Sequence, residues 1–174
     1  MRAATLADVN ALNELVARAY RGDAARAGWT HEADLLDGQR TDVEALSEMI
    51  RDPDKVILLA CDEETLVGCV LVERQGESTA YLGLLSVEPA RQSGGIGRFL
   101  IDAAEREAIS RFRAARMKMT VIRQREDLIP WYERRGYART GETAPFPLDD
   151  ERFGIPKRRD LEFVVLAKTL DRSR

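Results

Sequence analysis

Apolar residues near the start of the chain recur every three or four positions, which is the spacing of a helix. Val9, Leu12, Val16 and Tyr20 follow this period, and Thr5 precedes them as a residue that commonly caps a helix N-terminus. The pattern predicts a first helix after Thr5. The glycine-punctuated stretch that follows it, residues 21–40, is predicted to be a loop that can hold a short helix.

A second helical pattern occupies TDVEALSEMI, residues 41–50. Thr41 and Glu44 have the spacing of a capping box, in which each side chain bonds the other residue's backbone. Asp52-Pro53 follows, and the residue before a proline disfavours helix. The stretch therefore predicts a helix with Thr41 as its N-cap.

Three apolar runs come next, separated by the short polar stretches DEET and QGES. They cover residues 55–61, 66–74 and 79–87. Runs of this length joined by short polar turns predict three strands in an antiparallel meander.

The last run is followed by closely spaced glycines and then by a helical pattern that begins at Ile96. A strand, MKMTVI, comes after that helix, and a helix between two strands implies a parallel crossover. A short helix from about Asp127, ended by Gly136, and strands over 137–142 and 160–168 complete the pattern. No linker or repeat divides it, so residues 1–174 are predicted to form one α/β domain on a mixed sheet.

Composition narrows the classes of partner. Apolar residues make up 44% and charged residues 33% of the 174, with a net charge of −3. This balance favours an ordinary globular protein and gives no reason to expect nucleic acid. No apolar run approaches the ~20 residues that span a bilayer, and the N-terminus has no signal-peptide pattern. We expect no membrane partner and a cytoplasmic location.

Two chemistries have little to build on. Cys61, Cys69 and the single histidine, His31, offer no metal-ligand spacing, so no metal site is expected. A serine hydrolase would depend on His31 alone, and no GxSxG motif is present.

The glycines themselves, QSGGIG at 92–97, admit several interpretations. A triphosphatase would need GxxxxGK[ST], and no such lysine follows. A dinucleotide-binding enzyme would need a third glycine where Leu100 stands. What remains is a loop whose backbone N–H groups, at a helix N-terminus, can bind a pyrophosphate, or a plain glycine-rich turn.

Two motifs decide between these, because together they resemble the GNAT superfamily of acetyl-coenzyme A-dependent N-acyltransferases. LLSVEPARQSGGIGRFLIDAAE resembles its central strand, pyrophosphate loop and helix, and IPWYERRGY resembles a later signature that closes the site. The resemblance covers nearly the whole chain. It implies a GNAT fold, α/β, with a central mixed, mostly antiparallel twisted sheet of about six to seven strands and about four flanking helices. It also implies acetyl-coenzyme A as the cofactor.

By resemblance, the central strand pairs with the pantetheine arm and the glycine loop holds the pyrophosphate. The strand also carries a bulge in this family, which frees an N–H near Leu85 to face the thioester oxygen. Tyr132 stands where the family often has a tyrosine that protonates the departing thiolate. The residues expected to bind the cofactor are Leu85, Ser86, Val87, Gln92, Ser93, Gly94, Gly95, Ile96, Gly97, Arg98, Arg125 and Tyr132.

Two positions depart from the family pattern. Arg125 replaces an asparagine that many relatives use toward the pantetheine, so it could reach a phosphate or point to solvent. The central strand lacks the glutamate that some relatives use as general base. The amine would then lose its proton to water, to a backbone carbonyl or to an acid from elsewhere. Glu32 and Asp34, in the loop after the first helix, are the candidate acids, and a solvated loop is the alternative for each.

The acceptor is expected between the segment after the first helix and the loop before the last strand. The candidate acceptor-binding residues are Tyr20, Trp29, Glu32, Asp34 and Phe146. Aromatic and acidic side chains suit a cationic amine. Arg21, Arg26 and Arg40 would instead favour an amine that carries a carboxylate, so both remain open.

The expected function is acetyl transfer to a primary amine of a small molecule, with Tyr132 as general acid. The alternatives are a protein or peptide N-acetyltransferase and a non-catalytic acyl-coenzyme A sensor. Tyr132 separates the last of these, because a sensor needs no proton donor there. A homodimer is compatible with the resemblance, since dimers are common in the family.

Overall fold

Seven strands form the main sheet of the protein, whose computed structural model describes residues 1–171. In spatial order they are β1 (Arg2–Ala3), β3 (Lys55–Asp62), β4 (Thr65–Gln75), β5 (Thr79–Val87), β6 (Arg116–Ile122), β9 (Glu162–Thr169) and β7 (Ala138–Pro145). Only the β5–β6 pair is parallel, and α4 (Ile96–Phe112) is its crossover, as the sequence predicted. The α/β fold with a mixed, mostly antiparallel sheet is confirmed.

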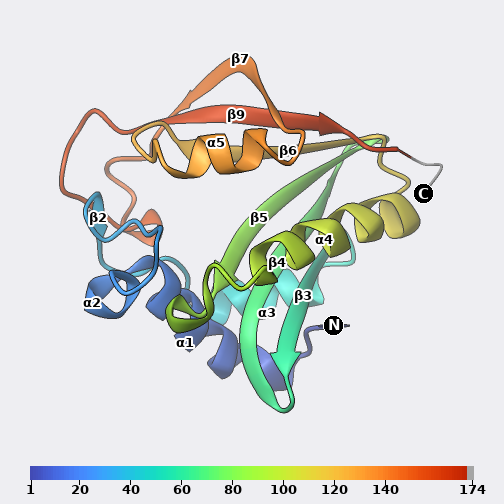
Figure 1. The fold of residues 1–174 in the computed structure, drawn as a ribbon, viewed down its shortest axis with the longest axis horizontal. Coiled ribbons are helices and arrows are strands. Elements are labelled where there is room, and N and C mark those ends of the chain that lie inside the picture. Colours follow the sequence, from blue (N-terminus) through green and yellow to red (C-terminus); the bar gives the residue numbers. More distant parts are fainter. Residues whose placement is uncertain (172–174) are drawn as a thin grey trace.

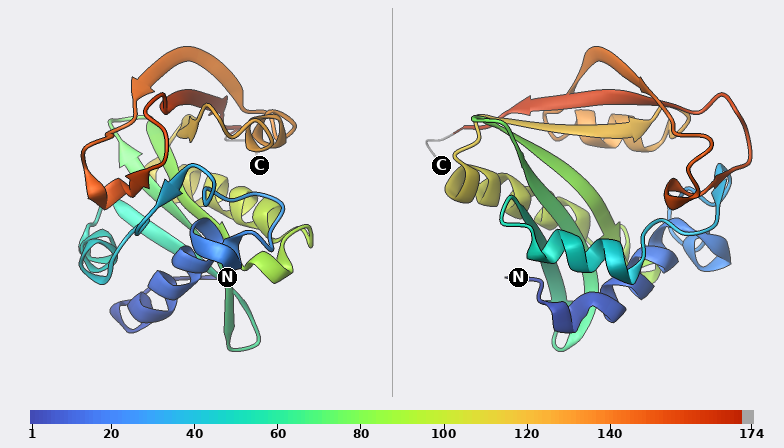
Figure 2. Two further views of the ribbon diagram at one scale, coloured as in Figure 1. Left: turned by 90° about the vertical axis from the view of Figure 1, so that its left-hand side faces the viewer. Right: turned by 180° about the vertical axis from the view of Figure 1, so that it is seen from behind.

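Helices cover both faces of the sheet around β3, β4 and β5 (Figures 1 and 2). On one face lie α1 (Val9–Tyr20) and α3 (Val43–Arg51), and on the other lies α4. Burial on both sides explains why β3 reads as an unbroken apolar run: Leu58 packs in the cluster under α4, and Leu59 in the cluster under α1.

Shorter elements border the sheet. They are two α-helices, α2 (Gly22–Ala25) and α5 (Leu128–Glu133), three 3-10 turns at Leu6–Asp8, Pro89–Arg91 and Glu151–Phe153, and a two-stranded sheet of β2 (Leu36–Asp37) with β8 (Ile155–Pro156). Because β2 pairs with β8, the segment after α1 is tied to the loop before β9. No helix within residues 1–171 is long and apolar enough to cross a bilayer.

Two local predictions were wrong. Asp42 rather than Thr41 caps α3, since its carboxylate accepts a bond from Ala45 N at 2.7 Å, and Thr41 Oγ1 has no partner among the described residues. Asp is a stronger N-cap than Thr, and Asp42 stands one position nearer the helix. β7 also runs on to Pro145, because its end pairs with Glu162 of β9.

The sheet opens between β5 and β6. Their parallel pairing covers only residues 79–81 with residues 116–118. Beyond that point β5 continues with β4 while β6 continues with β9, and the two halves of the sheet diverge in Figure 1. The site lies in this opening.

Candidate active site

A bulge in β5 begins the site. Opposite β4, Cys69 pairs with Ser86 and Leu71 with Gly83, so two residues of β5, Leu84 and Leu85, face the single Val70. Leu84 adopts a left-handed conformation, with φ of 52°. An L-residue pays about 1–2 kcal/mol for that conformation, so the surrounding contacts must hold it.

The bulge reverses which side of the sheet β5 presents. Leu82 packs in the cluster under α4, yet Leu84, two residues later, packs under α1. The carbonyl of Leu84 accepts hydrogen bonds from Ser86 Oγ at 3.1 Å and from Cys69 Sγ at 3.6 Å. Burial raises the pKa of Cys69 to about 12, so the thiol keeps its proton for this bond.

A cavity of about 230 Å³ lies in the opening between β5 and β6. Its walls include residues 81–87 of β5, residues 119–122 of β6, and the aromatic side chains of Tyr20, Trp29, Tyr132 and Phe146. The structure thus brings the bulge, Tyr132 and most of the predicted acceptor residues to one cavity.

Tyr132 projects from α5 into this cavity and is 5% exposed. Its ring packs edge-on against Trp131, with centroids 5.0 Å apart, and against Tyr137 at 6.0 Å. Burial raises the pKa of Tyr132 well above its usual value of about 10. The phenol is therefore protonated throughout the neutral range, and no residue among 1–171 hydrogen-bonds to it.

The glycine loop lies at the N-terminus of α4. Ser93 and Gly95 have φ of 68° and 84°, and the N–H groups of Ser93, Gly94 and Gly95 donate to no acceptor among residues 1–171. The first N–H groups of α4 add further unpaired donors by helix geometry. These donors and the positive end of the helix dipole fit a pyrophosphate.

Three arginines border a second, adjoining cavity above this loop. Arg98, Arg134 and Arg135 line it together with Trp131 and Gly97. The Arg135 guanidinium lies 3.5 Å from the centroid of the Trp131 ring, and burial with the charges of Arg134 and Arg98 lowers its pKa. This cluster of positive charge fits the phosphates of coenzyme A. The sequence interpretation did not include Arg134 and Arg135 among the cofactor-binding residues, although both lie within the later motif, IPWYERRGY.

The side chain of Gln92 forms hydrogen bonds within the protein. Its side chain accepts a bond from Trp29 N at 2.9 Å and donates to Val87 O at 3.4 Å. A Cβ on Gly28 would lie 2.5 Å from Gln92 Oε1, so a larger residue at position 28 would make the Gln92 side chain shift. The Gln92 side chain thus joins the glycine loop to the segment after α1.

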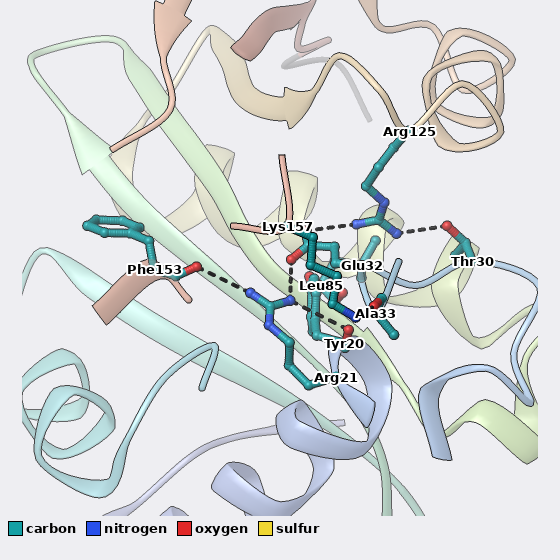
Figure 3. Close-up of polar contacts among 9 residues, drawn as sticks. All are labelled: Tyr20, Arg21, Thr30, Glu32, Ala33, Leu85, Arg125, Phe153 and Lys157. Carbon is teal, nitrogen blue, oxygen red and sulfur yellow. Dashed lines mark hydrogen bonds and ion pairs between the residues drawn. The ribbon is translucent and has the colours of Figure 1, made fainter. Parts of the chain in front are cut away.

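Glu32 forms the centre of a buried charge network (Figure 3). Arg21 donates to Glu32 Oε2 at 2.5 Å, and Arg125 donates to Glu32 Oε1 at 3.1 Å and to Thr30 Oγ1 at 2.7 Å. Burial favours a higher pKa for Glu32, but the charges of Arg125, Arg40 and Arg21 outweigh it and hold the pKa below its usual value. The carboxylate is ionised and a weak base.

Arg125 is therefore buried rather than pointing to solvent. It lines the cavity, and its Nε–H has no partner among the described residues. Tyr20 contacts the bulged part of β5, since its hydroxyl donates to Leu85 O at 2.7 Å. The Arg125–Glu32 and Tyr20–Leu85 hydrogen bonds each join residues more than 60 positions apart, so no local sequence pattern reveals them.

The remaining predicted residues divide between wall and surface. Phe146 is buried and packs on Phe163 at 5.2 Å, within the cavity wall. Trp29 is 41% exposed and borders both cavities. Asp34 is exposed, pairs with Arg26, and does not line either cavity. Residues 1–171 contain no group of three His, Cys, Asp or Glu side chains suited to a metal ion.

Comparison with known proteins identifies the family of this chain. The sequence matches the family model described as Acetyltransferase (GNAT) family over residues 11–137. A search of curated proteins gave no significant match.

Solved structures share the fold over almost the full chain. A ribosomal-protein-alanine N-acetyltransferase from Brucella melitensis has a TM-score of 0.70 at 22% identity, over 97% of this chain and 98% of that one. An aminoglycoside 6'-N-acetyltransferase complexed with coenzyme A has 0.68 at 20% identity, over 98% of each chain. A spermidine N-acetyltransferase variant from Vibrio cholerae has 0.67 at 16% identity, over 99% and 98%. The chain belongs to the GNAT family of acetyltransferases.

Proposed function

We propose that this protein transfers an acetyl group directly to the primary amine of a small molecule, with Tyr132 as the general acid. One observation carries the proposal: a protonated, buried phenol lines the same cavity as the bulge at Leu84 and Leu85. A strand edge left free beside a proton donor suits acyl transfer, whereas binding alone needs only the edge and the loop.

The donor supplies an acetyl thioester, and the chain supplies the surroundings. Residues 93–98 and the arginines of the second cavity hold the phosphates, and residues 85–87 hold the arm. The N–H of Leu85 is proposed to stabilise negative charge on the carbonyl oxygen, a contribution of ~3 kcal/mol for one preorganised donor.

Protons must balance in this reaction. The new C–N bond forms as the C–S bond breaks, the amine loses one proton, and the departing sulfur gains one. Tyr132 holds the proton for the sulfur. Glu32 remains the candidate for taking the amine's proton, but its lowered pKa makes it a weak base, so we expect the amine to react best when it arrives unprotonated.

Two of the structural neighbours bear names of small-amine acetyltransferases, for an aminoglycoside and for spermidine, which supports a small acceptor here. The aromatic walls formed by Trp29 and Phe146 also suit a bounded pocket. A protein acceptor is the second candidate, because another neighbour is named a ribosomal-protein-alanine N-acetyltransferase.

The test is a mass-detected acetylation screen of amino acids, polyamines, aminoglycosides, aryl amines and peptides, repeated with Tyr132→Phe. We expect a product with the wild type, and a kcat reduced by ~10²–10⁴ in the variant with unchanged affinity for coenzyme A. Tyr137→Phe is the matched control, since that hydroxyl bonds Glu105 on α4 and lies outside the cavity wall. Normal turnover by Tyr132→Phe would remove the general acid from the proposal.

A further inference from the structure

We propose that the acceptor amine carries a carboxylate, and that Arg40 is the specificity residue that binds it. This inference depends on the proposed acetyl transfer, because the ligand is taken to be the acceptor of that reaction. The binding site itself is inferred from the surroundings of Arg40. The sequence left a cationic acceptor and a carboxylate-bearing acceptor open, and the structure provides the means to choose between them.

The acidic side chains that favoured a cation are already occupied. Glu32 is held by Arg21 and Arg125, at 2.5 and 3.1 Å. Asp34 is outside the cavity and pairs with Arg26. A cationic amine would have to compete with these arginines for the only carboxylate among the described residues that line the cavity.

Arg40 is in the opposite situation. Of the arginines between residues 18 and 40, Arg18, Arg21 and Arg26 each form an ion pair, whereas Arg40 has neither an ion pair nor a hydrogen bond within residues 1–171. Its guanidinium is half-buried in the cavity wall and lies over the Tyr20 ring, 5.2 Å from the centroid. A guanidinium fixed on an aromatic face, with its donors unused, is suited to a carboxylate.

The cavity wall as a whole carries a net positive charge. The charged residues that line the cavity are Glu32, Arg40 and Arg125, and Arg21 backs Glu32 from the other side. Arg125 also has a buried Nε–H without a partner in the described part of the chain. Positive charge therefore exceeds negative charge, which favours an anionic group on the acceptor.

Tyr20 connects this site to the reaction centre. Its hydroxyl bonds Leu85 O at 2.7 Å, and its ring lies under Arg40. One tyrosine side chain thus separates the bulge from the guanidinium, a span that suits small amino acids or short peptides. The amine would lie toward Leu85 and Tyr132, and the carboxylate toward Arg40.

Matched acceptors provide the first arm of the test. Amino acids are compared with their own carboxamides, and spermidine serves as the cationic amine. We expect the wild type to prefer the carboxylates, and Arg40→Gln to raise their KM by ~10- to 100-fold while leaving the carboxamides and acetyl-coenzyme A unchanged. Arg40→Lys should recover part of the loss. Arg26→Gln, in the same segment but outside the cavity, should behave as wild type.

Binding without turnover provides the second arm. N-acetyl amino acids and their carboxamides are titrated calorimetrically into the protein with coenzyme A. Binding of the free acids that is lost in Arg40→Gln supports the inference even if no amine in the screen is acetylated, an outcome that would count against the proposed function alone. Transfer only to spermidine or carboxamides, or an equal loss for acid and amide in Arg40→Gln, would overturn the inference and leave acetyl transfer standing.

Discussion

The two ends of the active-site opening are built from different parts of the polypeptide. At the proposed donor end, the exposed loop presents unpaired main-chain N–H groups of Ser93, Gly94 and Gly95 beside the start of α4. At the acceptor end the surface is made by side chains, with Glu32 and Arg125 buried in an ion pair. We propose that the donor end binds a constant ligand through backbone N–H groups, supplemented by the arginines of the second cavity, and that the acceptor end binds a variable ligand through side chains alone.

This difference decides how each end tolerates change. A backbone site depends on conformation, so it is sensitive to which residues allow left-handed φ and insensitive to most side chains. A buried charge network depends on every partner, because removing one leaves the others without compensation. The predictions below separate these two sensitivities.

The largest effect is expected at the acceptor end from Glu32→Gln. The change leaves Arg21 and Arg125 buried with no counter-charge, and we expect a loss of about 3 kcal/mol in the free energy of unfolding. Urea denaturation measures it. Asp34→Asn, on an exposed carboxylate of the same loop, should change stability by no more than about 0.5 kcal/mol. Equal losses in both variants would show that the network adds nothing beyond a surface pair.

A smaller effect on stability, with a clear effect on binding, is expected from Gly95→Ala. A Cβ there meets no atom within 4 Å, so the cost is the left-handed conformation alone, about 1 kcal/mol. Because the loop presents its N–H groups only in that conformation, affinity for coenzyme A should fall roughly tenfold.

Gly76→Ala is the matched control for this change. Gly76 has φ of 77°, equally open surroundings, and a place in the β4–β5 turn outside both cavities. It should lose the same stability and no affinity. Calorimetric titration of coenzyme A into both variants would contradict the backbone assignment if the two affinities fell alike.

The smallest effect concerns pH. The pKa of Glu32 is lower in the folded state than in the unfolded state, so between these two values the folded state binds fewer protons. The resulting stabilisation of the fold is complete above about pH 4.5 and is lost as the pH falls through the folded pKa. The stability of the wild type should therefore fall more steeply from pH 5 to pH 3 than that of Glu32→Gln. Parallel curves in urea titrations at several pH values would mean that the carboxylate is not specially stabilised.

The same contrast explains what the sequence could predict. The strand meander, the crossover helix and the glycine loop depend on neighbours in the chain, and periodicity with a short motif located them. The bulge in β5 was expected only by resemblance, since YLGLLSV reads as a regular strand, and the left-handed conformation of Leu84 was not predicted. The pairing of Arg125 with Glu32 joins residues 93 positions apart, and composition alone could not distinguish it from a phosphate contact or a solvated side chain.

Errors arose where two local options were close in energy. Thr41 and Asp42 are adjacent candidates for the cap of α3, and Asp42 accepts the bond from Ala45 N. The end of β7 looked like a loop because of its prolines, but an edge strand tolerates them when a neighbour such as β9 supplies the pairing.

The bond between the Gln92 side chain and Trp29 N has a consequence for kinetic order. Gln92 begins the loop proposed to bind the donor, and Trp29 borders both that cavity and the one proposed to bind the acceptor. A donor that orders Gln92 would also order Trp29 through this bond, and the acceptor would then enter a cavity whose wall at Trp29 is already in place. We expect a sequential mechanism in which the donor adds first, with the acceptor binding more weakly to the empty enzyme than to the donor-loaded one.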